Sequence, residues 1–204
     1  MVEVTWLTRY NVFIAGVGGQ GLLTLGRLLG YAAIEAGYDV TVAEVHGLSQ
    51  RGGTLNVHVR IGSGEAPVIP TGGSNLFIAL EALEAIRYSK FIGKDTTVVI
   101  NDFLWPPPLS KYPSMEEILN KLRVLNNKVY VVDANAISKK IIGNIISSNI
   151  AIMGFSYAVD HGLKNRVKYE CIERALEKIF RGKALELNKM VLREGFEEGL
   201  KRLG

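Results

Sequence analysis

A glycine-rich turn between an apolar run and an amphipathic segment most constrains the fold of this chain. Residues 11–15 form a short apolar run, and the turn that follows is Gly16-Val17-Gly18-Gly19-Gln20-Gly21. Apolar residues then recur at helical spacing at Leu22, Leu25, Leu28, Leu29 and Ala32. Gly37 suits the end of that helix, and residues 40–45 form a second β-rich run. A strand–helix–strand unit of this kind has a right-handed crossover, so we expect a sheet that is at least partly parallel.

Further strands and helices are indicated along the rest of the chain. Residues 55–61 alternate between apolar and polar side chains, which predicts a strand with one buried face. Compact apolar runs predict strands at 76–80, 96–100 and 128–132. The helices expected are 81–91, a helix from the capping box of Ser114 and Glu117 to about 125, 165–181 and 184–202. We therefore predict one α/β domain over residues 1–204, with three layers, a Rossmann-like mostly parallel sheet, helices on both faces and a helical C-terminus.

The glycine turn has the G-x-G-x-x-G form used to bind dinucleotides, and it occupies the required place between a strand and a helix. Glycines at these positions let backbone N–H groups approach a phosphate at the helix N-terminus. Glu44, 23 positions after Gly21, suits a ribose hydroxyl. A stand-alone NAD(P)-binding oxidoreductase is therefore one candidate. Alternatively, the glycines only permit a tight turn and close packing, or admit the backbone of a partner.

A second polar, glycine-containing segment follows the second strand. It carries His46, Ser49, Gln50 and Arg51, and then Gly52 and Gly53. In an open α/β sheet this loop lies at the carboxyl edge, so we expect both loops to converge on one crevice. Arg51 suits a carboxylate or phosphate, and His46 suits proton transfer near neutral pH. Alternatively, Arg51 anchors a subunit interface and His46 caps the strand, while His58, within the alternating strand, is expected to be structural.

Several classes of site and partner are disfavoured by residue content. The single cysteine, Cys171, is expected in the core, and with three histidines it leaves no zinc or iron–sulfur ligand set. No apolar run approaches the roughly 20 residues of a spanning helix, and the N-terminus lacks a signal-peptide core, so we expect a cytoplasmic protein without a membrane partner. The net charge of +4 comes from the C-terminal half, where charges alternate in sign as on a solvated face, so no nucleic-acid partner is expected.

The two loops together resemble a known family. The turn at 16–21 and the segment Ala-Glu-Val-His-Gly-Leu-Ser-Gln-Arg-Gly-Gly at 43–53 resemble the gamma subunit or domain of 2-oxoacid:ferredoxin oxidoreductases, and most of all the small subunit of the indolepyruvate type. The resemblance is strong to about residue 80 and looser afterwards, where residues 149–154 and Asn188 also look like family features. The positions that match the family's loops are Gly16, Gly18, Gly19, Gln20 and Gly21, and then His46, Ser49, Gln50, Arg51, Gly52 and Gly53.

The resemblance implies a subunit that does not act alone. Such enzymes oxidatively decarboxylate a 2-oxoacid with thiamine diphosphate, transfer the acyl group to coenzyme A and pass electrons through iron–sulfur clusters to ferredoxin. This chain lacks the Gly-Asp-Gly…Asn-Asn arrangement that holds thiamine diphosphate and magnesium, and it lacks cluster cysteines. The resemblance therefore implies a large alpha-type partner that carries thiamine diphosphate, magnesium and clusters and that contacts ferredoxin, while this chain binds none of these alone and shapes the entrance for substrate or coenzyme A.

Three functions stay open on the sequence. They are a subunit of such an oxidoreductase, a stand-alone NAD(P)-binding enzyme, and a regulatory or assembly domain with the same fold. The 2-oxoacid is not fixed, and neither is the choice between coenzyme A, another nucleotide and the partner subunit as the occupant of the glycine-rich loops. An exposed docking face also permits a homo-oligomer when the partner is missing.

Overall fold

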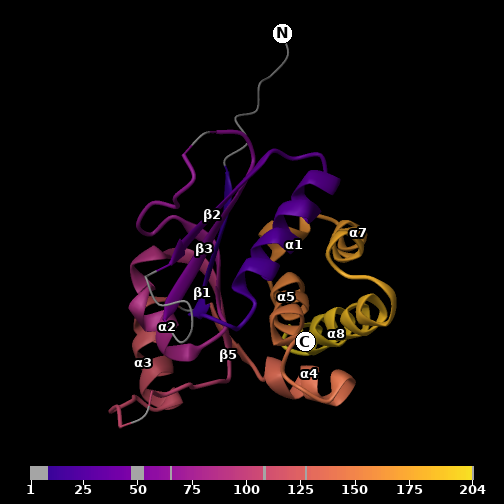
Figure 1. Cartoon of the computed structure of the whole chain (residues 1–204). Coiled ribbons are helices and arrows are strands. Elements are labelled where there is room, and N and C mark those ends of the chain that lie inside the picture. Colours follow the sequence, from indigo (N-terminus) through magenta and orange to yellow (C-terminus); the bar gives the residue numbers. More distant parts are fainter. Residues whose placement is uncertain (1–8, 47–52, 65, 108, 127, 204) are drawn as a thin grey trace.

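The computed structural model describes residues 9–46, 53–64, 66–107, 109–126 and 128–203. A six-stranded sheet in the order β2-β3-β1-β4-β5-β6 forms its centre (Figure 1). The strands are β1 (Tyr10–Val17), β2 (Val40–His46), β3 (Thr54–Ile61), β4 (Ser74–Ala79), β5 (Ile92–Asn101) and β6 (Val129–Val132). Each of the six coincides with a run predicted from the sequence.

The sheet is mixed, with one antiparallel strand inside it. β1, β4, β5 and β6 are mutually parallel neighbours. β3 lies between β1 and β2 and pairs antiparallel with both, so β1 and β2 point the same way without touching. The mostly parallel sheet is thus confirmed. From β1 the chain continues to β2 on one side of β1, and the next parallel strand, β4, lies on the other side. The glycine turn at the end of β1 therefore lies at the switch point of the sheet, where open α/β sheets bind ligands.

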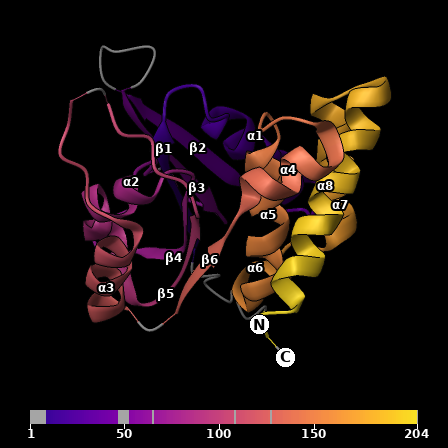
Figure 2. The same cartoon turned by 90° about the horizontal axis from the view of Figure 1, so that it is seen from below.

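Helices cover both faces of the sheet, as Figure 2 shows. On one face lie α2 (Ala82–Arg87), the short 3-10 helix η1 (Ser89–Phe91) and α3 (Met115–Leu125). On the other face lie α1 (Leu22–Glu35), α4 (Ala134–Ile142), α5 (Ser148–Val159), α6 (His161–Lys164), α7 (Tyr169–Ile179) and α8 (Gly182–Leu200). The three-layer α/β fold with a helical C-terminus is confirmed, and each face has its own apolar core.

Local sequence signals fix several of these helices. Ser114 and Glu117 form the predicted capping box at the start of α3. Gly37 has a φ of 83° just after α1 and donates its N–H to the Ile34 carbonyl, as a glycine that ends a helix does. Cys171 is buried, as expected. None of the described helices is long and apolar enough to cross a membrane.

The sequence predicted two of the five described helices after β6 and missed the other three. The helices expected over 165–181 and 184–202 are confirmed as α7 and α8, with α7 beginning at Tyr169 because the chain turns through residues 165–168. The short α6, which Asp160 caps, lies before the expected range and was not predicted. α4 and α5 were not predicted. All 12 residues of α5 are buried, because the helix lies between β5 and α8, so its sequence lacks the polar face that marks an amphipathic helix.

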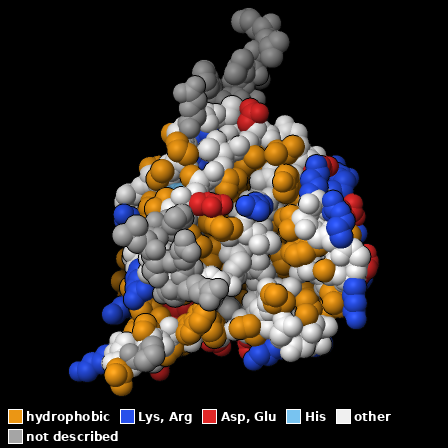
Figure 3. All heavy atoms as spheres, viewed as in Figure 1, with side chains coloured by type: hydrophobic (Ala, Val, Ile, Leu, Met, Phe, Trp, Pro, Cys, Tyr) orange, Lys and Arg blue, Asp and Glu red, His pale blue; other side chains and the backbone are white. Residues whose placement is uncertain are grey.

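Positive charge on the C-terminal helices lies at the surface. Figure 3 shows Lys and Arg side chains along the side of the molecule that carries α7. Acidic partners accompany many of them, as in the pairs Lys189–Glu177 at 2.8 Å and Arg193–Glu197 at 3.0 Å. This arrangement agrees with the solvated face expected from the alternating charges.

Candidate functional site

The first glycine turn is closed by the side chain of Gln20. Its Oε1 accepts the N–H of Val17 at 2.7 Å, and its Nε2 donates to the carbonyl of Leu80 at 3.0 Å, just beyond β4. A Cβ at Gly16 would lie 2.8 Å from the same Oε1. Gln20 therefore ties the turn to the neighbouring strand, and Gly16 leaves the room that this requires.

The end of the turn is fixed by a long-range contact. Gly21 has a φ of 77° and precedes the first turn of α1. Asn149, at the start of α5, donates to the Gly21 carbonyl at 3.0 Å, and a Cβ on Gly21 would lie 2.5 Å from its Nδ2. Gly19, with a φ of 104°, faces open space. The turn therefore requires glycine at Gly21, because Asn149 approaches closely, and at Gly19, because its φ angle is positive.

The two loops meet at their bases. The N–H of Gly18 donates to the carbonyl of Gly53 at 3.0 Å. Of the other residues predicted in the second loop, Ser49, Gln50, Arg51 and Gly52 lie outside the described part of the chain, and the side chain of His46 is not described. Whether the second loop lines the crevice therefore stays a prediction.

Glu44 does not have the position that a dinucleotide site requires. It is exposed on β2 and pairs with Val57 of β3. Because β3 separates β2 from β1, Glu44 stands two strand spacings, roughly 10 Å, to the side of the strand that leads into the glycine turn. A simple dinucleotide fold has these two strands as neighbours, so the sheet order disfavours the NAD(P) hypothesis.

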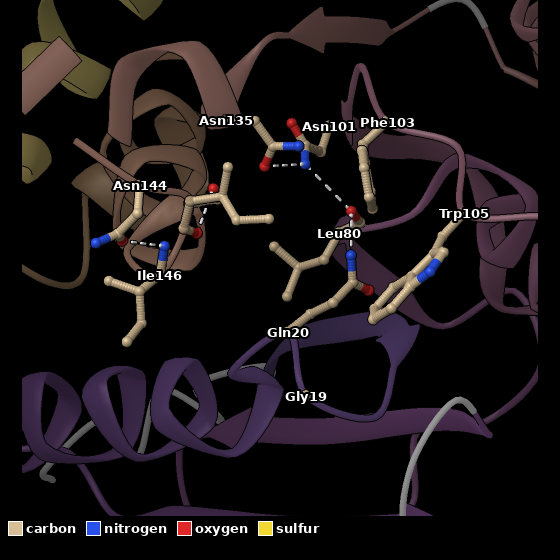
Figure 4. A pocket seen from close by; sticks show the side chains of 11 residues that line it. Gly19, Gln20, Leu80, Asn101, Phe103, Trp105, Asn135, Asn144 and Ile146 are labelled. Carbon is tan, nitrogen blue, oxygen red and sulfur yellow. Dashed lines mark hydrogen bonds between the residues drawn. The ribbon is translucent and has the colours of Figure 1, made fainter. Parts of the chain in front are cut away.

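A pocket of about 480 Å³ opens beside the first turn, and we call it the crevice pocket. Figure 4 shows that its walls come from the ends of parallel strands and from both ends of α4. It is lined by Gly19, Gln20, Leu80, Asn101, Phe103, Trp105, Asn135, Asn144, Ile145, Ile146 and Ser148. This lining combines apolar and aromatic side chains with amides, and none of its described residues is charged.

The amide side chains of the pocket already make some hydrogen bonds within the protein. Asn101 accepts the Ala134 N–H at 3.0 Å and donates to the Leu80 carbonyl at 3.2 Å and to Asn135 Oδ1 at 3.3 Å (Figure 4). Asn144 Oδ1 accepts the Ile146 N–H at 2.9 Å. The oxygens of Asn135 and Asn144 are thus occupied while their NH₂ groups remain as donors, so the pocket suits a neutral, planar group with acceptor atoms.

Sequence reasoning missed most of this pocket. Asn101 follows the strand predicted at 96–100, and Asn135 follows the one predicted at 128–132. Ligands of open α/β sheets bind at the carboxyl edge of the parallel strands, and this rule selects both positions as well as the ends of the first two strands. Trp105 carries no such signal, because a distant residue holds its loop in place.

Removing the Gln20 side chain tests how the turn is held. We expect Gln20→Ala to lower the free energy of unfolding by about 2 kcal/mol, because the Val17 N–H loses its acceptor and the Leu80 carbonyl loses a donor. Urea denaturation measures the change. Gln20→Glu keeps an oxygen for Val17 but places a second acceptor oxygen against the Leu80 carbonyl, so it should also lose stability, and wild-type stability in either variant would contradict this account.

Comparison with known proteins gives a consistent result. The model of the pyruvate ferredoxin/flavodoxin oxidoreductase family matches residues 11–198. The indolepyruvate oxidoreductase subunit IorB of Archaeoglobus fulgidus is 38% identical over 200 residues, covering 94% of this chain and 96% of that protein.

Solved structures share the fold at lower identity. The gamma subunit of a keto/oxoacid ferredoxin oxidoreductase from Geobacter sulfurreducens superposes with a TM-score of 0.71 at 23% identity, over 94% of this chain and 99% of that one. The 2-oxoglutarate:ferredoxin oxidoreductase of Magnetococcus marinus, solved with 2-oxoglutarate, coenzyme A and succinyl-CoA bound, gives a TM-score of 0.71 at 17% identity. That match covers 96% of this chain and 32% of the larger one.

Proposed function

The chain belongs to the pyruvate ferredoxin/flavodoxin oxidoreductase family as a small subunit of a 2-oxoacid:ferredoxin oxidoreductase, and we propose that its enzyme oxidises indolepyruvate or another aryl pyruvate. The observation that carries the aryl substrate is the 38% identity to an indolepyruvate oxidoreductase subunit over nearly the full length of both chains.

We further propose that a larger partner subunit holds thiamine diphosphate, magnesium and the iron–sulfur clusters. A cluster takes four cysteine ligands, and this chain has one cysteine, buried in α7. Among the described residues, no group of three or more His, Cys, Asp or Glu side chains is placed to hold a metal. The residues of this chain therefore do not fit these groups, and its contribution lies in its crevice and its contact with the partner.

Part of coenzyme A is the ligand that we propose for the crevice pocket. An adenine ring is neutral and planar and carries nitrogen acceptors, which suits the free NH₂ groups of Asn135 and Asn144 and the ring of Trp105. The carboxylate of a 2-oxoacid is bound most strongly by a cationic partner, and no Lys, Arg or His is among the described residues of this pocket. We therefore place the 2-oxoacid in the partner subunit.

We also propose that the loops at 16–21 and 46–53 face the active site of the partner, with Gln50 and Arg51 at the contact. Support comes from the bond between Gly18 and Gly53, which joins the bases of the two loops at the carboxyl edge of β1. Arg51→Ala and Gln50→Ala should weaken assembly or turnover of the complex. Unchanged assembly and turnover in both variants would reject this contact.

Co-expression with the candidate large subunit tests the function. We expect indolepyruvate-dependent reduction of ferredoxin or a viologen dye, in the presence of coenzyme A, only when both chains are present. The reaction rate should fall to background when this chain is omitted, because it supplies part of the assembled site.

The other outcomes separate the competing functions. An inactive but stable complex, tested with pyruvate, branched 2-oxoacids and 2-oxoglutarate, would show whether only the aryl substrate is wrong. A large subunit that turns over equally well without this chain would favour an assembly or regulatory role. Failure of the two chains to associate would contradict the subunit assignment in this pair.

A further inference from the structure

Trp105 stands between two hollows of the surface. Its side chain lines the crevice pocket on one side. It also lines a smaller pocket of about 230 Å³, together with Val17, Glu84, Arg87, Pro106, Pro107 and Tyr112. The residue is 48% exposed, and Figure 4 shows its indole at the rim of the crevice pocket, opposite Asn135. The position of this one ring therefore decides where one hollow ends and the other begins.

A buried carboxyl group holds the backbone of Trp105. Glu81, fully buried just before α2, accepts the Trp105 N–H at 3.1 Å through Oε1. The same oxygen accepts the hydroxyl of Tyr112 at 2.8 Å, and Oε2 accepts the N–H of Glu84 at 3.1 Å. Burial, together with the bond to Glu81, raises the pKa of Tyr112 above its ordinary range, so this hydroxyl stays a donor.

Capping α2 explains only one of these three bonds. A cap needs a single acceptor for an N–H in the first helical turn, and Glu84 provides that donor. The other oxygen is used on two donors 24 and 31 residues further along the chain. Because burying a carboxyl group is costly unless it is well hydrogen-bonded, this arrangement shows that the segment carrying Trp105 is held at a defined place.

Few other bonds fix that segment. Residues 104–113 form no helix or strand where they are described, and Pro106 and Pro107 have no N–H to donate. The bonds of Ser110 go to the Pro107 carbonyl, inside the segment itself. Before Trp105, the Phe103 carbonyl accepts the Ala82 N–H at 3.0 Å. Among the described residues, Glu81 thus supplies the side-chain bonds that join the middle and the end of the segment to the body of the protein.

We propose that Trp105 is a partition that sets the extent of the crevice pocket, and that Glu81 and Tyr112 are positioning residues that hold it there. The proposal deepens the proposed function and rests on it, since it makes Trp105 the determinant of how the crevice accepts the ring of coenzyme A. Replacing Trp105 by a small residue would merge the two pockets and remove the stacking surface. Removing the hydrogen bonds of Glu81 or Tyr112 would leave the indole ring present but poorly placed.

Kinetics of the assembled complex give the first test. Tyr112→Phe removes one hydroxyl and keeps the ring, and we expect it to raise the KM for coenzyme A roughly fivefold while kcat and the KM for the 2-oxoacid stay unchanged. Trp105→Ala should raise the KM for coenzyme A by more, roughly 20-fold, because the stacking surface is lost. Tyr31→Phe on α1 is the matched control and should behave like the wild type.

Fluorescence of the isolated chain gives a second test that does not depend on the proposed function. The chain has two tryptophans, so Trp6→Phe leaves Trp105 as the only tryptophan, whose emission is excited selectively at wavelengths that tyrosine does not absorb. In that background Tyr112→Phe and Glu81→Ala should increase acrylamide quenching of Trp105 at least about twofold, while Tyr31→Phe should not, because only the first two variants release the segment.

The kinetic and the fluorescence measurements test different parts of the proposal, and each can contradict its part independently of the other. Unchanged quenching in Tyr112→Phe would overturn the positioning role of Tyr112 and Glu81, even if Glu81→Ala proved unstable. Increased quenching with no change in the KM for coenzyme A would overturn the partition role in the crevice. If the complex shows no dependence on coenzyme A at all, the proposed function fails while the quenching result still stands.

Discussion

Replacing Gly154 with alanine should destabilise the chain by at least about 3 kcal/mol, the cost of forcing a side chain into a packed contact. A Cβ on Gly154 would lie 2.0 Å from the carbonyl oxygen of Leu192 on α8, a distance that no side chain tolerates. The opposing glycine is as closely placed, because a Cβ on Gly195 would lie 2.1 Å from the Ala151 oxygen on α5. The two helices would have to separate, which opens the core beneath the C-terminal half.

Thermal denaturation followed by circular dichroism measures this effect. A loss of this size in a chain of 204 residues corresponds to a fall in Tm of about 6–12 °C. Gly195→Ala should cause a similar fall, and a sharp drop in soluble yield for either variant would have the same cause.

Gly30→Ala is the matched control. Gly30 also lies within a helix, α1, but its Cβ would approach only Cγ2 of Val42, at 3.2 Å. Val42 is a partly exposed side chain on the edge strand β2, so it can shift, and alanine favours the helix by about 1 kcal/mol. We expect a change within about 1 kcal/mol of zero. Equal effects at Gly154 and Gly30 would show that helix contact is not what requires glycine in α5.

The parts of the fold that follow from local backbone chemistry could be predicted from the sequence. The first turn demands glycine at Gly19 and Gly21 because both have positive φ angles. The capping box of α3 and the glycine after α1 are likewise requirements of a few consecutive residues. Such signals mark where elements begin and end whatever lies elsewhere in the chain.

The order of the strands could not be predicted in the same way. The alternation in residues 55–61 indicates one buried face, yet β3 is an interior strand with both faces covered. Its polar residues Asn56 and His58 are buried as well. Alternation reports polarity rather than burial, so it hides a strand in which a polar side chain is buried, as His58 is, with the Ile69 N–H as its partner.

The crevice also depends on contacts between residues far apart in sequence. Glu81 reaches Trp105 across 24 residues, and Asn149 reaches Gly21 across 128. Neither contact has a sequence period, and α5, which supplies Asn149, is apolar on all sides. The sequence therefore predicted the loop that forms one wall of the pocket, but not the residues that close it.

Lowering the pH from 7 to 5 should destabilise the protein by about 2 kcal/mol through His58 alone, because only the unfolded chain binds its proton in this range. His58 is 2% exposed and lies edge-on to Phe13, with ring centroids 4.9 Å apart. Its Nδ1 accepts the Ile69 N–H at 3.0 Å, which protonation would prevent. Burial, then the charges of Arg60 and Lys90, lower its pKa to about 4.

The destabilisation by His58 occurs between the pKa of the unfolded chain and the lower pKa of the folded protein. In the unfolded chain the pKa of His58 is near 6.5, so the destabilisation begins as the pH falls through this value. It is complete, at about 3 kcal/mol, below pH 4, where the folded protein binds the proton as well. Measuring unfolding at pH 7 and 5 avoids most carboxylate titration. His58→Gln keeps a side-chain oxygen and removes the titration, so its stability should vary less with pH than that of the wild type. His161→Gln, at an exposed position, should leave the wild-type dependence intact. A wild-type slope in His58→Gln would place the pH dependence elsewhere in the protein.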